Sequence, residues 1–135
     1  MSQTSEGGCL CGAVRFTVEG EFERFFLCHC SRCRKGTGTA HAANLFSTTA
    51  RLRWLAGEDR IRAYTVPGTR HTRCFCADCG STLPKVRPSD GVVVVPAGSL
   101  DTPLAFRPVA HICMDSKADW DDALETVPKL PGLPG

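Results

Sequence analysis

The sequence predicts a mostly β fold, a compact single domain of small antiparallel sheets with one or two short helices. Two observations predict it. Apolar residues alternate along several short segments, and a period of two is typical of half-buried strands. Nine cysteines, eight of them in three closely spaced groups, stand in a chain of 135 residues, a length that suits one ordinary domain. We expect that domain to span residues 1–135, with a core at about 7–126 and a tail at 127–135.

The first predicted strand, 13–18, shows the alternation clearly, because Val14, Phe16 and Val18 fall on one face. A run of four valines at 92–95 lies between a glycine and a proline and is typical of a strand buried on both faces. Segments 52–55 and 61–66 are separated by a Gly-Glu-Asp turn. Further strands are predicted at 24–28, 40–46 and 105–112, the last interrupted by Pro108.

Helix signals are few. A short helix is predicted at 31–35, ended by Gly36 and Gly38, and a second one at 116–124. The tail at 127–135 holds three prolines and two glycines, which preclude regular structure. We expect it to lie extended over the domain or to fray.

Composition and charge limit which cellular compartment and which binding partners we expect for the protein. A net charge of +2 is too weak to favour nucleic acid or an anionic membrane. No run approaches the roughly 18 apolar residues of a membrane helix, and the first six residues lack the basic and apolar regions of a secretory signal. We therefore expect a cytoplasmic protein, without a nucleic-acid or membrane partner, whose reduced cysteines bind metal.

Two cysteine pairs have spacings that suit a zinc site. In an extended Cys9-x-Cys11 segment both sulfurs lie on the same side. Cys76-x-x-Cys79 brings its sulfurs together through a tight turn, in which Gly80 can adopt a positive φ. Four thiolates around one zinc form the closed, tetrahedral arrangement of structural sites. If the two pairs share one ion, that ion stabilises the fold by linking distant parts of the chain.

The middle group, Cys28-x-Cys30-x-x-Cys33, offers three thiolates. Three protein ligands with an open fourth position are the pattern of catalytic zinc. His29 lies between two ligands, so we expect it to point to the opposite face, where it packs or forms hydrogen bonds. The site is closed and structural instead if a fourth ligand comes from Cys74, Cys113, His41, His71 or His111.

Other uses of clustered cysteines fit less well. A secreted disulfide framework usually has an even number of cysteines and an export signal. A thioredoxin-like Cys-x-x-Cys opens a helix in a βαβ setting, which these strands do not provide. Iron–sulfur clusters also use thiolates, but the paired layout suits two zinc sites better. Seven thiolates and two zinc ions move the formal charge from +2 to about −1, which counts further against nucleic acid.

Four motifs carry a resemblance to a known family. They read GGCLCGAVRF at 7–16, CHCSRCRKGTG at 28–38, RCFCADCGSTL at 73–83, and HI followed by KADW within 111–120. From about Gly7 to about Pro134 the chain is similar to the glutathione-dependent formaldehyde-activating enzyme family, to which centromere protein V also belongs. The seven-cysteine pattern makes this resemblance specific.

The resemblance implies two zinc ions per chain, one structural and one catalytic and labile. The structural ligands would be Cys9, Cys11, Cys76 and Cys79, and the catalytic ones Cys28, Cys30 and Cys33. It implies a carbon–sulfur lyase that joins glutathione and formaldehyde into S-(hydroxymethyl)glutathione. His41 occupies a place where relatives often carry Phe, and it is a candidate to line the site. Arg32, Arg34 and Lys35, beside the ligands, are candidates to bind the glutathione carboxylates.

Two kinds of function remain open. One is an enzyme, a zinc-dependent carbon–sulfur lyase acting on a glutathione–aldehyde adduct. The other is a non-enzymatic zinc-binding module or glutathione carrier in which both zinc ions are structural. Three thiolates give a zinc site a formal charge of about −1, which lowers its Lewis acidity. For the enzyme we therefore expect capture and positioning of a thiol rather than strong activation of a carbonyl.

Overall fold

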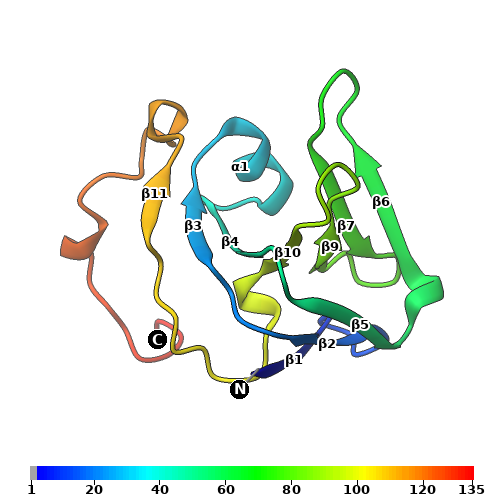
Figure 1. Cartoon of the computed structure of the whole chain (residues 1–135). Helices are drawn as coiled ribbons and strands as arrows, with labels where there is room; N and C mark the ends of the chain where they lie inside the picture. The colour runs from blue at the N-terminus through cyan, green and yellow to red at the C-terminus, as the bar shows by residue number, and fades with distance from the viewer. Residues whose placement is uncertain (1–2) are drawn as a thin grey trace.

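The strands form three small sheets in the computed structural model, which describes residues 3–135 (Figure 1). The first sheet has the order β1-β2-β5, with bounds Thr4–Gly8, Arg15–Glu19 and Arg51–Ala56. The second has the order β11-β3-β4-β10-β9, with bounds Ala110–Ile112, Arg24–Cys28, Ala42–Ser47, Val93–Pro96 and Lys85–Val86. The third has the order β6-β7-β8, with bounds Ile61–Thr65, Thr72–Cys76 and Thr82–Leu83. The predicted mostly β class is confirmed.

One strand pair departs from the antiparallel expectation. β11 lies parallel to β3, with Ile112 opposite Cys28, whereas the other paired strands are antiparallel. Only the end of the predicted strand 105–112 is regular. Pro108 has no N–H to donate, and pairing begins directly after it, where the Val109 N–H donates to Phe25 O at 2.8 Å.

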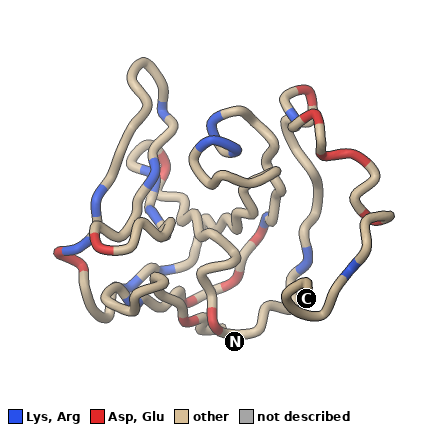
Figure 2. Tube along the Cα trace, turned by 180° about the vertical axis from the view of Figure 1, so that it is seen from behind, with Lys and Arg blue, Asp and Glu red and all other residues tan. Residues whose placement is uncertain are grey.

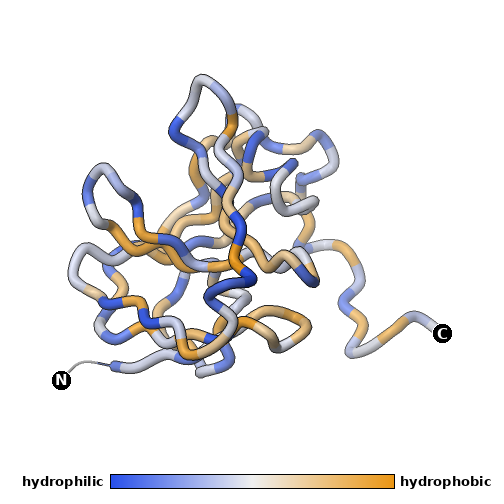
Figure 3. The backbone as a smooth tube through the Cα atoms, turned by 90° about the vertical axis from the view of Figure 1, so that its right-hand side faces the viewer, coloured by the Kyte–Doolittle hydropathy of each residue, from blue (hydrophilic) through white to orange (hydrophobic). Residues whose placement is uncertain are grey.

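The core lies where the three sheets meet. Val14, Phe16 and Val18 are fully buried, as their alternation predicts. The second sheet contributes Phe25, Leu45, Val93 and Val95, and the third contributes Cys76 and Leu83. Figure 3 shows apolar segments running through the middle of the molecule. Because these residues come from all three sheets, the core fixes the sheets relative to one another.

The helical predictions are half right. The first becomes α1 (Ser31–Thr37), which passes through Gly36 and ends at Gly38 in the left-handed conformation, with φ 67°. The prediction that Gly36 ends the helix is therefore wrong. The predicted helix 116–124 is wrong as well, since that segment lies between two 3₁₀ turns, Met114–Ser116 and Leu124–Thr126. Two further 3₁₀ turns span Glu58–Arg60 and Ala97–Ser99.

The C-terminal tail and α1 lie outside the three sheets. Residues 122–135 are all exposed, so the tail does not pack over the domain, and Figure 3 shows it standing away from the body. α1 lies between the β3–β11 edge on one side and the β6–β7 hairpin on the other (Figure 1). This arrangement leaves a cleft beside α1, described below.

Candidate functional site

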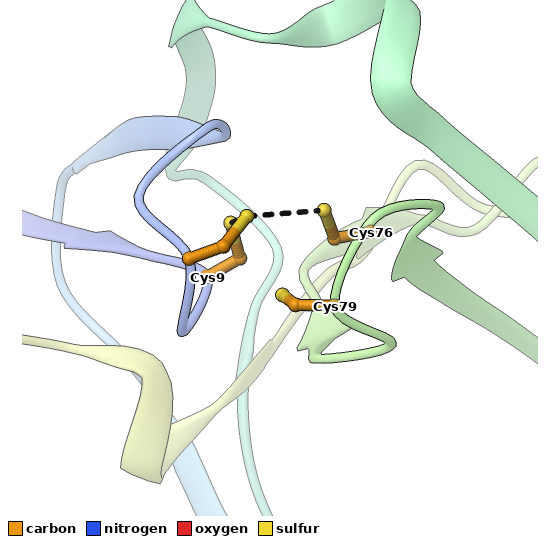
Figure 4. A group of neighbouring side chains, drawn as sticks. Cys9, Cys76 and Cys79 are labelled. Carbon is orange, nitrogen blue, oxygen red and sulfur yellow. Dashed lines mark hydrogen bonds between the residues drawn. The ribbon is translucent and has the colours of Figure 1, made fainter.

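Four cysteines meet where the first and third sheets approach each other. The sulfurs of Cys9 and Cys11 are 3.6 Å apart, and that of Cys11 is 3.9 Å from Cys76. Together with Cys79, they lie within 4.8 Å of one another (Figure 4). A zinc–sulfur distance of about 2.3 Å implies tetrahedral ligands about 3.8 Å apart. This four-cysteine cluster therefore fits a zinc ion, and its sulfurs are too far apart for disulfides, whose S–S distance is about 2.05 Å.

The local backbone explains how the pairs form. Cys9 and Cys11 lie in a turn after β1 rather than in the extended segment expected, and Gly12 closes it with φ 82°. The predicted positive φ at Gly80 is confirmed at 77°, and its N–H donates to Cys76 O at 2.7 Å. Each turn brings two sulfurs to one side.

Hydrogen bonds with Ser81, whose hydroxyl is 3.2 Å from the sulfur, lower the pKa of Cys79 to about 6. This lower pKa favours the thiolate that metal binding requires.

Three further cysteines meet at the end of β3. Cys28 is the last residue of β3, Cys30 caps α1 and accepts the Cys33 N–H at 3.3 Å, and Cys33 lies in the first turn of that helix. Their sulfurs also lie within 4.8 Å of one another. Burial, followed by the neighbouring Cys30 and Cys28 thiols, raises the pKa of Cys33. A bound cation would stabilise the thiolate of Cys33 and so lower its pKa. This three-cysteine cluster therefore also has the character of a metal site.

The three-cysteine cluster opens onto a cleft. Cys33 lines a cavity of about 240 Å³ between α1, β4 and β7, and both Cys33 and Cys28 line a second one of about 580 Å³. The two cavities are adjacent and share the lining residues Arg32, Cys33, Asn44, His71, Lys85 and Val94. We call the combined space the thiol cleft. The four-cysteine cluster does not line it.

The thiol cleft is electropositive. Its cationic residues are Arg32, Arg70, Arg73, Lys85 and Arg87, and Figure 2 shows basic residues on α1 and the facing hairpin, with acidic ones gathered after β11. Lys85 is half-buried and donates to Thr72 O, and Arg73 donates to the Thr82 hydroxyl at 3.0 Å. Burial, and then the charges of Lys85, Arg32 and Arg73, lower the pKa of His71. A space with these charges suits an anionic ligand.

The five residues considered as a fourth ligand of the three-cysteine cluster lie in different places in the structure. Cys74, His71 and His41 line the thiol cleft, and His41 and His111 group with His29 rather than with the three cysteines. Cys113 is the one that neighbours the cluster. Burial raises the pKa of Cys28, and the Cys113 thiol adds to this rise. Cys113 is exposed and lies outside the group of mutually close sulfurs.

The prediction for His29 is confirmed. The residue is 1 % exposed, and its Nε2 lies 2.9 Å from Nδ1 of His111. Among the cations expected at the site, Arg32 lines the thiol cleft, whereas Arg34 donates to Ser116 O at 3.1 Å and Lys35 lies outside the lining. Lys85, Arg73, Arg70 and Arg87 were not predicted as cleft residues, since they lie 37 to 54 residues beyond Cys33 along the chain.

Fold and site together define a small β protein with two cysteine centres, one of them opening onto a basic cleft. The chain matches the model of the glutathione-dependent formaldehyde-activating enzyme family over residues 4–116, and it belongs to that family. A crystal structure of a Rhodobacter sphaeroides protein resembles it, with a TM-score of 0.55, 25 % identity, and coverage of 78 % of this chain and 98 % of that one. No curated protein matches significantly. Among residues 3–135, no helix has the length and hydropathy to cross a membrane.

Proposed function

We propose that the protein joins glutathione and formaldehyde into S-(hydroxymethyl)glutathione and catalyses the reverse cleavage, as a zinc-dependent carbon–sulfur lyase. The observation that carries the proposal is the position of the three-cysteine cluster, which lies at the wall of an electropositive cleft. Membership of the family supports the thiol and the aldehyde. In the reaction, the thiol sulfur forms a bond to the formaldehyde carbon, the carbonyl electron pair moves to oxygen, and oxygen takes a proton as sulfur loses one.

The residues that would hold the catalytic zinc are Cys28, Cys30 and Cys33, and those that would hold the structural zinc are Cys9, Cys11, Cys76 and Cys79. Zinc, when bound at the three-cysteine cluster, stabilises a thiolate near neutral pH and polarises a carbonyl oxygen. The protein's own contribution is orientation. Glutathione carries two carboxylates, and charge-assisted hydrogen bonds from Lys85, Arg73 and neighbouring cations would hold them while the thiol lies at the cluster.

The second candidate function is a zinc-binding module in which both metals are structural. Cys113 is the observation that favours it, because its thiol neighbours Cys28 and can close the fourth position. The two functions differ in what Cys113→Ser does. In the enzyme, the variant keeps both zinc ions and its activity. In the structural module, it loses one zinc ion.

The reaction is tested with ¹³C-labelled formaldehyde and glutathione, by exchange NMR on anaerobically purified, zinc-loaded protein. We expect the wild type to accelerate exchange between free and adduct formaldehyde. Cys33→Ser removes the effect, while Arg62→Ala, a change outside the lining of the thiol cleft, keeps it. Glutathione binding without any acceleration indicates a carrier, and absence of binding indicates the structural module. Zinc per chain is measured in parallel by native mass spectrometry, with and without glutathione.

The proposal includes a reducing compartment and small-molecule partners only. All nine cysteines are free thiols in the structure, in keeping with a cytoplasmic protein. Five of the sixteen basic residues line the thiol cleft, which suits a small anionic ligand.

A further inference from the structure

Three of the four histidines of the chain meet near the end of β3. His29 follows β3, His41 precedes β4, and His111 lies in β11. β3 pairs with both of the other strands at Cys28, which brings the three ends together. The ring centroids of His29 lie 5.0 Å from His41 and 5.1 Å from His111. One nitrogen from each ring lies within 4.8 Å of the others.

A carboxylate stands behind the central histidine. Asp121 Oδ2 lies 3.1 Å from Nδ1 of His29, and among the described residues neither of these buried atoms completes a hydrogen bond. A carboxylate at this place favours the proton on Nδ1, so that Nε2 presents its lone pair to the other rings. A carboxylate on the far nitrogen of a metal-binding histidine is the usual outer partner of such ligands.

We propose that His29, His41 and His111 form a third metal site, for a divalent ion such as Zn²⁺, with Asp121 orienting His29. The ligand atoms would be Nε2 of His29 and Nδ1 of His111, which lie 2.9 Å apart. Zinc–nitrogen distances of 2.0–2.1 Å imply about 3.3 Å between tetrahedral ligands. The two rings therefore move apart by about 0.4 Å on binding, which small side-chain rotations provide.

The chemistry of this site differs from that of the cysteine clusters. Three neutral imidazoles leave the charge of the ion in place, whereas three thiolates outweigh it. His111 is exposed, so a fourth position is reachable from solvent, and His41 also lines the thiol cleft. A metal here would stand at the wall of that cleft as a cationic, nitrogen-bound centre. Imidazole ligands suit zinc, copper and nickel in preference to magnesium or calcium.

The test counts metal in untagged, full-length protein by native mass spectrometry at increasing Zn²⁺. We expect the wild type to bind one more zinc ion per chain than His41→Gln or His111→Gln. His71→Gln is the matched control, because His71 is the remaining histidine and lies outside the cluster, and this variant is expected to bind as the wild type does. The comparison is a difference of one ion, so it does not depend on how the cysteine clusters are filled. Equal metal counts in all four proteins overturn the proposal.

Two further measurements identify the ligands and the role of Asp121. Histidine ring ¹⁵N NMR should show metal-dependent shifts at Nε2 of His29 and Nδ1 of His111, with the His71 ring unchanged. Asp121→Asn should weaken zinc binding at this site by about 10- to 100-fold and leave the metal of the cysteine clusters in place. Unchanged affinity in Asp121→Asn shows that the carboxylate does not orient His29, and metal shifts confined to His71 overturn the site.

Discussion

The two cysteine clusters use the same ligand atom in different surroundings. The four-cysteine cluster joins turns from two sheets, and Cys76 within it is completely buried in the core. The three-cysteine cluster uses one short segment, 28–33, and opens onto the thiol cleft. As the proposed structural zinc site, the four-cysteine cluster would link distant parts of the chain, and the fold would then depend on its metal. The three-cysteine cluster, whose proposed ligands are close in sequence, would bind metal with little effect on the rest of the fold.

The largest expected effect is on the four-cysteine cluster. Cys76→Ser should destabilise the protein by at least about 4 kcal/mol, because it removes a core residue and a ligand of the proposed structural zinc site. Zinc content and thermal unfolding measure the change, and soluble yield reports a variant that does not fold. Cys74→Ser, on the same strand but outside both clusters, is the control. Equal losses in the two variants would show that burial alone matters and that the cluster does not bind a stabilising ion.

Cys33→Ser tests the other side of the comparison. We expect one zinc ion fewer and a rate of adduct formation lowered by at least about 100-fold, with a stability loss of at most about 2 kcal/mol. Exchange NMR and thermal unfolding provide the two readouts. A large destabilisation with little change in rate would reverse the roles assigned to the two clusters.

The cations of the thiol cleft should affect binding more than the chemical step. Lys85→Ala and Arg73→Ala are each expected to raise the KM for glutathione about tenfold, because each removes a charge-assisted hydrogen bond. Arg62→Ala removes a cation from the neighbouring strand β6, outside the cleft lining, and should leave KM unchanged. Added salt should weaken wild-type binding more than that of Lys85→Ala. A fall in kcat alone would place these residues in the chemical step instead.

The smallest expected effect is a dependence of stability on pH. Burial and nearby cations hold the pKa of His71 below 6.5 in the folded protein, so the unfolded chain binds this proton more readily. Stability should therefore decrease as the pH falls below about 6.5. Chemical denaturation at pH 7.5 and 5.5 measures the decrease, and His71→Gln should reduce it. A decrease of the same size in the variant would assign the effect to other groups.

Apolar alternation predicted seven of the eleven strands, but it missed β1, β7 and the two-residue strands β8 and β9. β7 reads TRCFC, and its inward-facing residues include Cys74 and Cys76. Both cysteines pack as small apolar residues, and an alternation counted without cysteine does not show this strand. β1 reads TSEGG and has no apolar pattern of its own, so its pairing with β2 determines it.

The cysteine pairs and the cysteine triplet were predictable because the spacing within each is local, whereas the cleft was not. Both cysteine groups found from sequence come together in the structure. Lys85 and Arg73 line the same cavity as Cys33 because strands of two sheets meet there, which no local pattern encodes. The histidine cluster was missed for the same reason. His29, His41 and His111 are spread over 83 residues, and only the order β11-β3-β4 makes them neighbours.

The parallel pairing of β11 with β3 has a consequence for how the protein assembles. It joins residues 26–28 to residues 110–112, a separation of 84 positions along the chain. Such a long loop closes slowly, because its entropy is lost before the new contacts form. We therefore expect β11 to dock after the segments that carry the two cysteine clusters have folded. During synthesis the three-cysteine cluster would acquire its metal while its β11 side is still open, and docking would then cover it with the segment that carries His111 and Cys113.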